Sequence, residues 1–84
     1  MLFRIDTFEM EGTTVVQVKG QLVGEGVAEL ERALQGVKAP LVVDLAFLRT
    51  ADAEGIKILR SIVEDGGELR NASPYVQLLL NREK

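Results

Sequence analysis

One stretch of the sequence, PLVVDLAFLRTADAEGIKILRSIVEDGG at residues 40–67, holds a strand signal, a polar loop and a helix signal in direct succession. The apolar, β-branched run at residues 41–43 follows a proline and is typical of a strand that is buried on both faces. We therefore predict a central parallel strand at this position. The remainder of the chain is interpreted outward from it.

From Ile56 onward the apolar residues recur three and four positions apart, which predicts an amphipathic helix. Its inward stripe comprises Ile56, Leu59, Ile62 and Val63. Its outward face carries Lys57, Arg60 and Glu64. Two glycines, Gly66 and Gly67, are expected to end the helix.

The loop between this strand and this helix is the best candidate for a functional site. Asp52 is placed to cap the first free N–H groups of the helix, and Glu54 lies at the positive end of the helix dipole. An acidic residue in a first turn also has a purely structural explanation, since it stabilises the helix by roughly 0.3–1 kcal/mol. The candidate partner-binding residues are Thr50, Asp52, Ala53, Glu54, Gly55 and Lys57.

The chain before this stretch predicts a hairpin and a helix. Strands are expected at residues 3–8 and 13–22, joined by a turn at residues 11–12, with Gly20 marking a bulge. The segment at residues 24–26 is interpreted as a flexible lead-in, since it lacks the lysine and Ser/Thr of a phosphate loop. Apolar spacing from Val27 to Leu34 then predicts a helix that Gly36 ends.

The chain after this stretch predicts a short strand at residues 67–71 and a last helix, with Ser73 as its cap and Pro74 at its first position. Tyr75 and Leu78 fall off the inward stripe of this helix, and either form an exposed contact or fill space in the core. The whole pattern predicts one α/β domain with a four-stranded mixed sheet and three helices mostly on one face.

Composition excludes most familiar chemistries. The 84 residues include no cysteine and no histidine, which argues against disulfides, thiol or imidazole catalysis and most transition-metal sites. The net charge of −3, with scattered basic residues, argues against nucleic-acid binding. No segment approaches the ~20 apolar residues of a membrane span. We expect a cytoplasmic protein that is not an enzyme and needs no cofactor.

Asp44 and Asp52 straddle the end of the predicted central strand, and pairs of carboxylates serve in acid/base or magnesium sites. Asp52 is sufficiently explained as a cap, and Asp44 is expected to face the sheet surface or a loop. We therefore predict no metal and no catalytic residue.

The order of elements and three local stretches resemble the STAS domain, the fold of bacterial anti-sigma-factor antagonists. VKGQL at residues 18–22 resembles the end of the family's second strand. PLVVDL at residues 40–45 with DAEGI at residues 52–56 resembles its central strand and the start of its second helix. GGELRNASP at residues 66–74 is similar to its fourth strand and third helix.

The resemblance implies a protein-interaction module in transcriptional regulation, with an anti-sigma factor or kinase-like protein as partner. In phosphorylation-switched members a serine follows the aspartate, whereas Ala53 stands here and cannot accept a phosphoryl group. Alternatives are an accessory subunit of a lipid-transporting ABC system and a sensor of nucleotides or lipids.

Length is a second departure from the family, whose members usually continue into a further strand and helix. The C-terminally shortened chain is therefore expected to leave a sheet edge exposed, which favours a homodimer or a complex with a larger protein.

Overall fold

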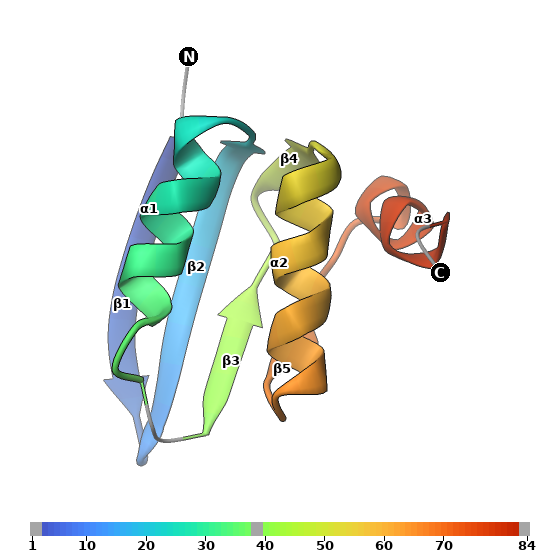
Figure 1. Cartoon of the computed structure of the whole chain (residues 1–84). Coiled ribbons are helices and arrows are strands. Elements are labelled where there is room, and N and C mark those ends of the chain that lie inside the picture. Colours follow the sequence, from blue (N-terminus) through green and yellow to red (C-terminus); the bar gives the residue numbers. More distant parts are fainter. Residues whose placement is uncertain (1–2, 38–39, 83–84) are drawn as a thin grey trace.

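The computed structural model describes residues 3–37 and 40–82, in which three helices lie against a five-stranded mixed sheet (Figure 1). The strands are β1 (Phe3–Met10), β2 (Thr13–Leu22), β3 (Leu41–Asp44), β4 (Leu48–Ala51) and β5 (Glu68–Arg70). The helices are α1 (Glu25–Leu34), α2 (Ala53–Glu64) and α3 (Pro74–Arg82). The predicted fold class is confirmed.

The N-terminal hairpin forms as predicted. β1 and β2 pair antiparallel over their full length, from Phe3 opposite Gly20 to Met10 opposite Thr13. Glu11 and Gly12 make the turn with φ values of 52° and 82°. Two successive positive φ angles are the mark of the tight turn that matches the twist of a hairpin.

The central position of β3 is also confirmed. β3 lies between β2 and β5 and runs parallel to both. Successive strand residues point to opposite faces of a sheet, and both valines are buried although they lie on different faces: Val43 is fully buried and Val42 is 6% exposed. An apolar run without alternation is what such a strand requires.

The sheet has one strand more than the sequence predicted. Leu48–Ala51, which was expected to be loop, forms β4 and pairs parallel with the end of β2. Asp44 accepts a hydrogen bond from the backbone N–H of Ala46, which turns the chain after β3. The chain then pairs with β2 from Gly20 opposite Leu48, and the register shifts between Gly20 and Gln21, an irregularity at the glycine for which a bulge was predicted. β4 thus continues the line of β3 beside the same neighbour.

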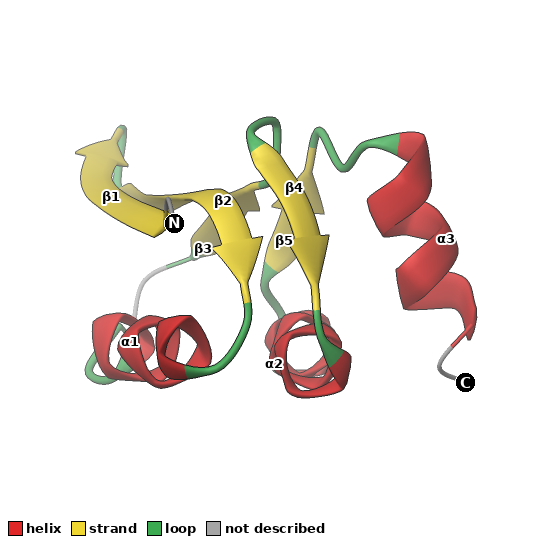
Figure 2. Ribbon diagram, turned by 90° about the horizontal axis from the view of Figure 1, so that it is seen from above, coloured by secondary structure: helices red, strands yellow, loops and turns green. Residues whose placement is uncertain are grey.

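Helices α1 and α2 cover one face of the sheet, whereas the opposite face carries no helix (Figure 2). Leucine, valine and isoleucine side chains from the covered face and from all three helices form the core. α3 lies at the side of the sheet, beside β4 and α2. Its predicted cap is present, since the hydroxyl of Ser73 accepts from the N–H of Val76 at 3.2 Å. We call the helix-free side the open face.

Three large apolar side chains of α2 and α3 are exposed, one of them against the prediction from the sequence. Val63, predicted to face inward, is 50% exposed. Its side chain faces a groove of about 410 Å³ that is also lined by Leu69 and Leu80, instead of facing the sheet. Tyr75 and Leu78, for which two positions were open, are 52% and 54% exposed. None of the helices in the described part of the chain is long and apolar enough to cross a membrane.

Candidate functional site

The start of α2 is built by Asp52, which is the residue just before the helix. Its side chain accepts a hydrogen bond from the backbone N–H of Gly55 at 2.8 Å, and its carbonyl accepts from Ile56 at 2.9 Å. Its own N–H donates to the carbonyl of Leu22 at 3.1 Å, which fixes the cap to the end of β2. The predicted capping role of Asp52 is confirmed.

The same carboxylate also holds the start of α1. Its second oxygen accepts a hydrogen bond from the backbone N–H of Gly24 at 3.2 Å. Gly24 has φ 54° and ψ −123°, a conformation open chiefly to glycine, and it directly precedes α1. The segment at residues 24–26 is therefore held in place, and its interpretation as a flexible lead-in is wrong.

Gly55 explains why the start of α2 can approach β2 so closely. A Cβ atom at this position would lie 2.5 Å from the carbonyl oxygen of Leu22 and 3.1 Å from the Cβ of Ala51. No side chain fits into that space without movement of the backbone. Gly55 is buried and its role is packing, so it is not available for direct contact with a partner.

The six predicted site residues therefore divide into two groups. Thr50 is half-buried in β4 and Gly55 is buried beneath the helix start. Asp52, Ala53, Glu54 and Lys57 are exposed. The hydrogen bond between Gly24 and Asp52 adds Glu25, the first residue of α1, to the same part of the molecule. We call Glu25, Asp52, Ala53, Glu54 and Lys57 the helix-start surface.

Sequence reasoning missed the contribution of the α1 start to this surface. The available signal was the pair of glycines around Glu25. Gly26 is buried, and a Cβ atom there would lie 3.2 Å from the ring of Phe3. Gly26 thus serves close packing, whereas Gly24, where an added Cβ atom would meet nothing within 4 Å, serves the positive φ of 54°. The sequence alone does not distinguish these roles from flexibility.

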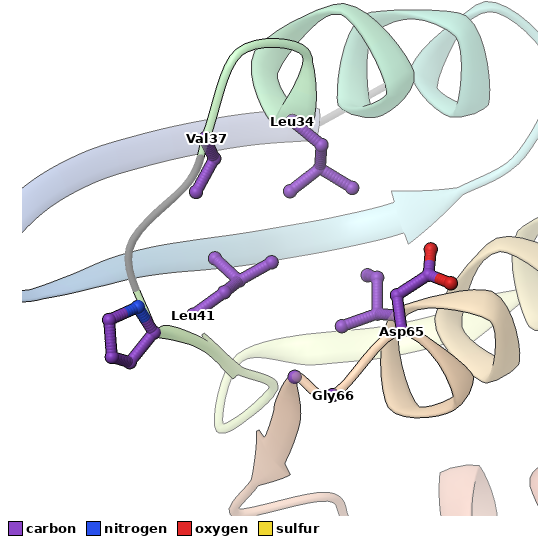
Figure 3. A pocket seen from close by; sticks show the side chains of 8 residues that line it. Leu34, Val37, Leu41, Asp65 and Gly66 are labelled. Atoms are coloured by element: carbon purple, nitrogen blue, oxygen red, sulfur yellow. The ribbon is translucent and has the colours of Figure 1, made fainter.

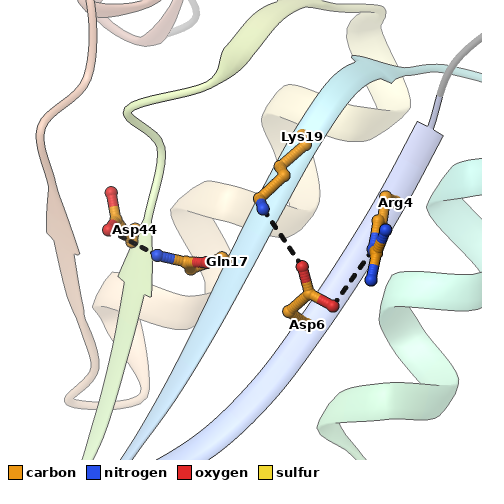
Figure 4. Close-up of polar contacts among 5 residues, drawn as sticks. All are labelled: Arg4, Asp6, Gln17, Lys19 and Asp44. Atoms are coloured by element: carbon orange, nitrogen blue, oxygen red, sulfur yellow. Dashed lines mark hydrogen bonds and ion pairs between the residues drawn. The ribbon is translucent and has the colours of Figure 1, made fainter.

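Asp44 belongs to a separate polar group on the open face (Figure 4). It accepts hydrogen bonds from the N–H of Ala46 at 3.0 Å and from the side-chain amides of Asn71 and Gln17 at 3.2 and 3.3 Å. These donors, the Ala46 N–H first, together with the charge of Arg70, hold the pKa of Asp44 below its ordinary value despite partial burial. Asp44 and Asp52 are thus engaged by different donors. Within residues 3–37 and 40–82 no cluster of three potential metal ligands is found.

A hollow of about 470 Å³ lies between the C-terminal ends of α1 and α2, at the end of these helices away from the helix-start surface (Figure 3). Its walls are mainly the aliphatic side chains of Leu34, Val37, Leu41 and Ile62, with the carboxylate of Asp65 at one side. We assign no ligand to it.

Solved structures with the same arrangement of elements are STAS domains. An anti-sigma-factor antagonist STAS domain from Rhodobacter sphaeroides superposes with a TM-score of 0.67 at 20% sequence identity, over 87% of this chain and 94% of that chain. The chain has the STAS fold. A second STAS structure, the anti-sigma-factor antagonist SpoIIAA in its unphosphorylated form, gives a TM-score of 0.65 at 19% identity, over 95% of this chain and 82% of that chain.

At this level of identity the likeness concerns the fold. No family model matches the sequence. No curated protein matches it either. The STAS fold predicted from the order of elements and three local stretches is nevertheless confirmed.

Proposed function

We propose that this STAS domain is a non-enzymatic interaction module whose helix-start surface binds a basic segment of a protein partner. The observation that carries the proposal is that structural residues and exposed residues alternate at the start of α2. Asp52 and Gly55 are used for structure, whereas Ala53, Glu54 and Lys57 are exposed beside them. A rigid, exposed first turn is well suited to recognition.

The charges of this surface favour a basic partner. Glu25 and Glu54 stand in the first turns of α1 and α2, where the positive ends of both helix dipoles stabilise their negative charge. Two exposed carboxylates at helix starts that Asp52 links would attract a lysine- or arginine-rich segment and speed its association. Lys57, one turn further along α2, limits the acidic area on one side.

The STAS fold suggests the class of partner. Both similar structures are anti-sigma-factor antagonists, so an anti-sigma factor or a related kinase-like protein in a bacterial cytoplasm is the partner we propose. The methyl group of Ala53 cannot be phosphorylated, and binding would therefore not be switched at this position. A transport-associated ATPase is the alternative partner that the test distinguishes.

The test is affinity capture with the purified chain, followed by mass spectrometry of retained proteins. Glu54→Lys reverses one of the two exposed charges and leaves the capping hydrogen bond of Asp52 in place. We expect it to reduce recovery of the specific partner at least about tenfold, the loss seen when a central interface residue is disrupted. The identity of the recovered protein, anti-sigma factor or transporter ATPase, decides between the two partner classes.

The matched control is Glu64→Lys, which makes the same charge change at the last residue of α2, at the far end of the helix from the proposed surface. Recovery with this variant should equal that of the unchanged chain. A partner that is retained equally by the unchanged chain and both variants contradicts the proposed surface.

A further inference from the structure

The open face of the sheet carries exposed apolar side chains that the proposed partner surface does not use. Met10 on β1 is 58% exposed, Phe8 beside it is 40% exposed, and Phe47 in the turn before β4 is 62% exposed. Exposed apolar groups gathered on one face commonly mark an interaction site. The open face lies on the side of the sheet opposite α1 and α2 (Figure 2).

Phe47 projects at one end of this face. Its carbonyl accepts a hydrogen bond from the N–H of Gly20 at 3.0 Å, which fixes the turn to β2. The ammonium group of Lys19 lies 5.6 Å from the centre of its ring. Lys19 points to the open face, where it binds Asp6 (Figure 4). The ring of Phe47 is thus held at this end of the open face by a cation–π contact.

A hollow of about 370 Å³ lies at the other end of the same face. Its apolar walls come from Met10, Val15 and Val42, and its rim carries Glu11, Glu68 and Arg70. The strand register places Val15 beside Val42, so the floor of the hollow is continuous across β2 and β3. Val15 and Lys19 are four residues apart on β2, which separates the hollow from the Phe47 end by about 13 Å.

The charges at these two ends are opposite. The strand register places Asp6, Asp44 and Arg70 at one level in the middle of the face. Toward Phe47 lie Arg4 and Lys19, each 3.2 Å from the carboxylate of Asp6, so this end carries the positive side chains. Around the hollow, Glu68 pairs with Arg70 at 2.8 Å, and Glu11 adds one net negative charge. An apolar projection with positive charge and an apolar hollow with negative charge therefore occupy one surface.

We infer that the open face binds the open face of a second copy of this chain. A twofold axis in the plane of the sheet and perpendicular to its strands brings the Phe47 end of each copy over the hollow of the other. Both contacts form at once, because a twofold interface repeats each contact. A twofold axis along the strands is disfavoured, since it places like-charged ends together. The resulting dimer leaves the helix-start surfaces of both copies uncovered.

Sedimentation equilibrium of the purified chain over a range of concentrations tests the association. We expect the mass to approach twice the protomer mass of 9.2 kDa. Phe47→Asp should raise the dimer dissociation constant at least about tenfold, as for a buried aromatic anchor. The control Leu78→Asp, at a similarly exposed leucine on α3 away from the open face, should leave it unchanged. Circular dichroism checks that both variants are folded, and Phe47→Ser provides a milder change.

The geometry of the dimer is tested by cross-linking, for which the absence of native cysteine is an advantage. Chains carrying Phe47→Cys and Met10→Cys are mixed and treated with a short thiol-reactive cross-linker. We expect mixed dimers that join position 47 of one copy to position 10 of the other.

Several outcomes overturn the inference. They are a chain that remains monomeric at all concentrations, dimers that are unaffected by Phe47→Asp, and cross-links that join position 47 to position 47. Recovery of a different protein on this face by a chain that stays monomeric also overturns it. Glu54→Lys should not change the dissociation constant, so the dimer and the proposed partner surface are tested separately.

Discussion

Asp52 concentrates two stabilising roles in one side chain. One carboxylate oxygen caps α2 through Gly55, and the other accepts from Gly24 ahead of α1. We predict that Asp52→Ala lowers the free energy of unfolding by about 1–2 kcal/mol, the upper part of the range for loss of a helix cap. Urea denaturation of both proteins at pH 7 measures this difference.

Asp52→Asn is the control for that prediction, since asparagine caps helices about as well as aspartate. Its free energy of unfolding should remain close to that of the unchanged chain. If Asp52→Ala also matches the unchanged chain, then the carboxylate does not stabilise the two helix starts.

At Gly55 we expect a glycine-to-alanine substitution to lower the free energy of unfolding, the opposite of its usual effect in a helix. Replacement of glycine by alanine inside a helix normally stabilises a protein by about 1 kcal/mol. At Gly55 the new methyl group would lie 2.5 Å from the carbonyl oxygen of Leu22, a backbone atom that cannot move aside cheaply. We predict that Gly55→Ala instead destabilises the chain by about 1–3 kcal/mol.

Thermal unfolding is a sufficient measurement for Gly55→Ala, because the expected change is a clear decrease in melting temperature. Ala53→Gly is a useful companion, since it alters an exposed position two residues earlier in the same helix without adding any atom. An increase in melting temperature with Gly55→Ala would mean that α2 does not lie as close to β2 as described.

At the scale of elements, β4 is the main difference between the predicted and observed sheet. Leu48 is 3% exposed and belongs to the core, whereas a leucine in a polar loop would be mostly in contact with water. We predict that Leu48→Ala costs about 2–5 kcal/mol, as for other buried leucines. Phe47→Ala, at the exposed neighbouring position, should change the free energy of unfolding by less than about 0.5 kcal/mol.

Chemical denaturation of these two variants at low protein concentration, where association does not contribute, compares the positions directly. Equal costs for both variants would show that Leu48 is not part of the core.

The elements that could be predicted from the sequence are those with a regular spacing of apolar residues. β2 was predicted at its observed bounds because Val16 and Val18 alternate with polar residues, and α2 because its apolar residues recur at helical spacing. β4 was missed because its four residues are too few for a period and its partner is distant in sequence. Val63 was predicted to face inward because its spacing puts it near the apolar stripe of α2. Spacing alone does not show whether another element buries a residue at the margin of that stripe.

The candidate site was predicted in part for the same reason. Asp52 and Glu54 carry local signals of a helix start, and both lie where expected. The role of Gly24 depends on a hydrogen bond across 28 positions of the chain, which no local pattern encodes. Long-range contacts of this kind are set by the fold, and only the structure shows them.

At the scale of the whole molecule, acid should destabilise the protein. The pKa of Asp44 is lowered chiefly by the Ala46 N–H, that of Asp6 by Lys19 and that of Glu68 by Arg70. A carboxyl whose pKa is lower in the folded state stabilises that state above its unfolded pKa of about 4 and loses this contribution as pH falls. We predict a decrease in the free energy of unfolding as the pH falls from about 5 to about 2.

Asp44→Asn tests the share of the half-buried carboxyl. This variant keeps an oxygen to accept from Ala46 but does not titrate, so its stability should depend less on pH in the acid range. Urea denaturation at about pH 7 and about pH 3 provides the comparison. An unchanged pH dependence would assign the effect to Asp6 and Glu68 alone.

The double engagement of Asp52 has a further consequence for inheritance. Because one side chain fixes two helix starts relative to each other, Glu25 and Glu54 form a template of set spacing. The basic partner that we propose would have to match both charges together, and a change at either helix start alone would weaken the fit. Substitutions at Glu25 or Glu54 are then expected to be accompanied by substitutions in the partner protein. Such correlated changes between related species would be evidence for the contact.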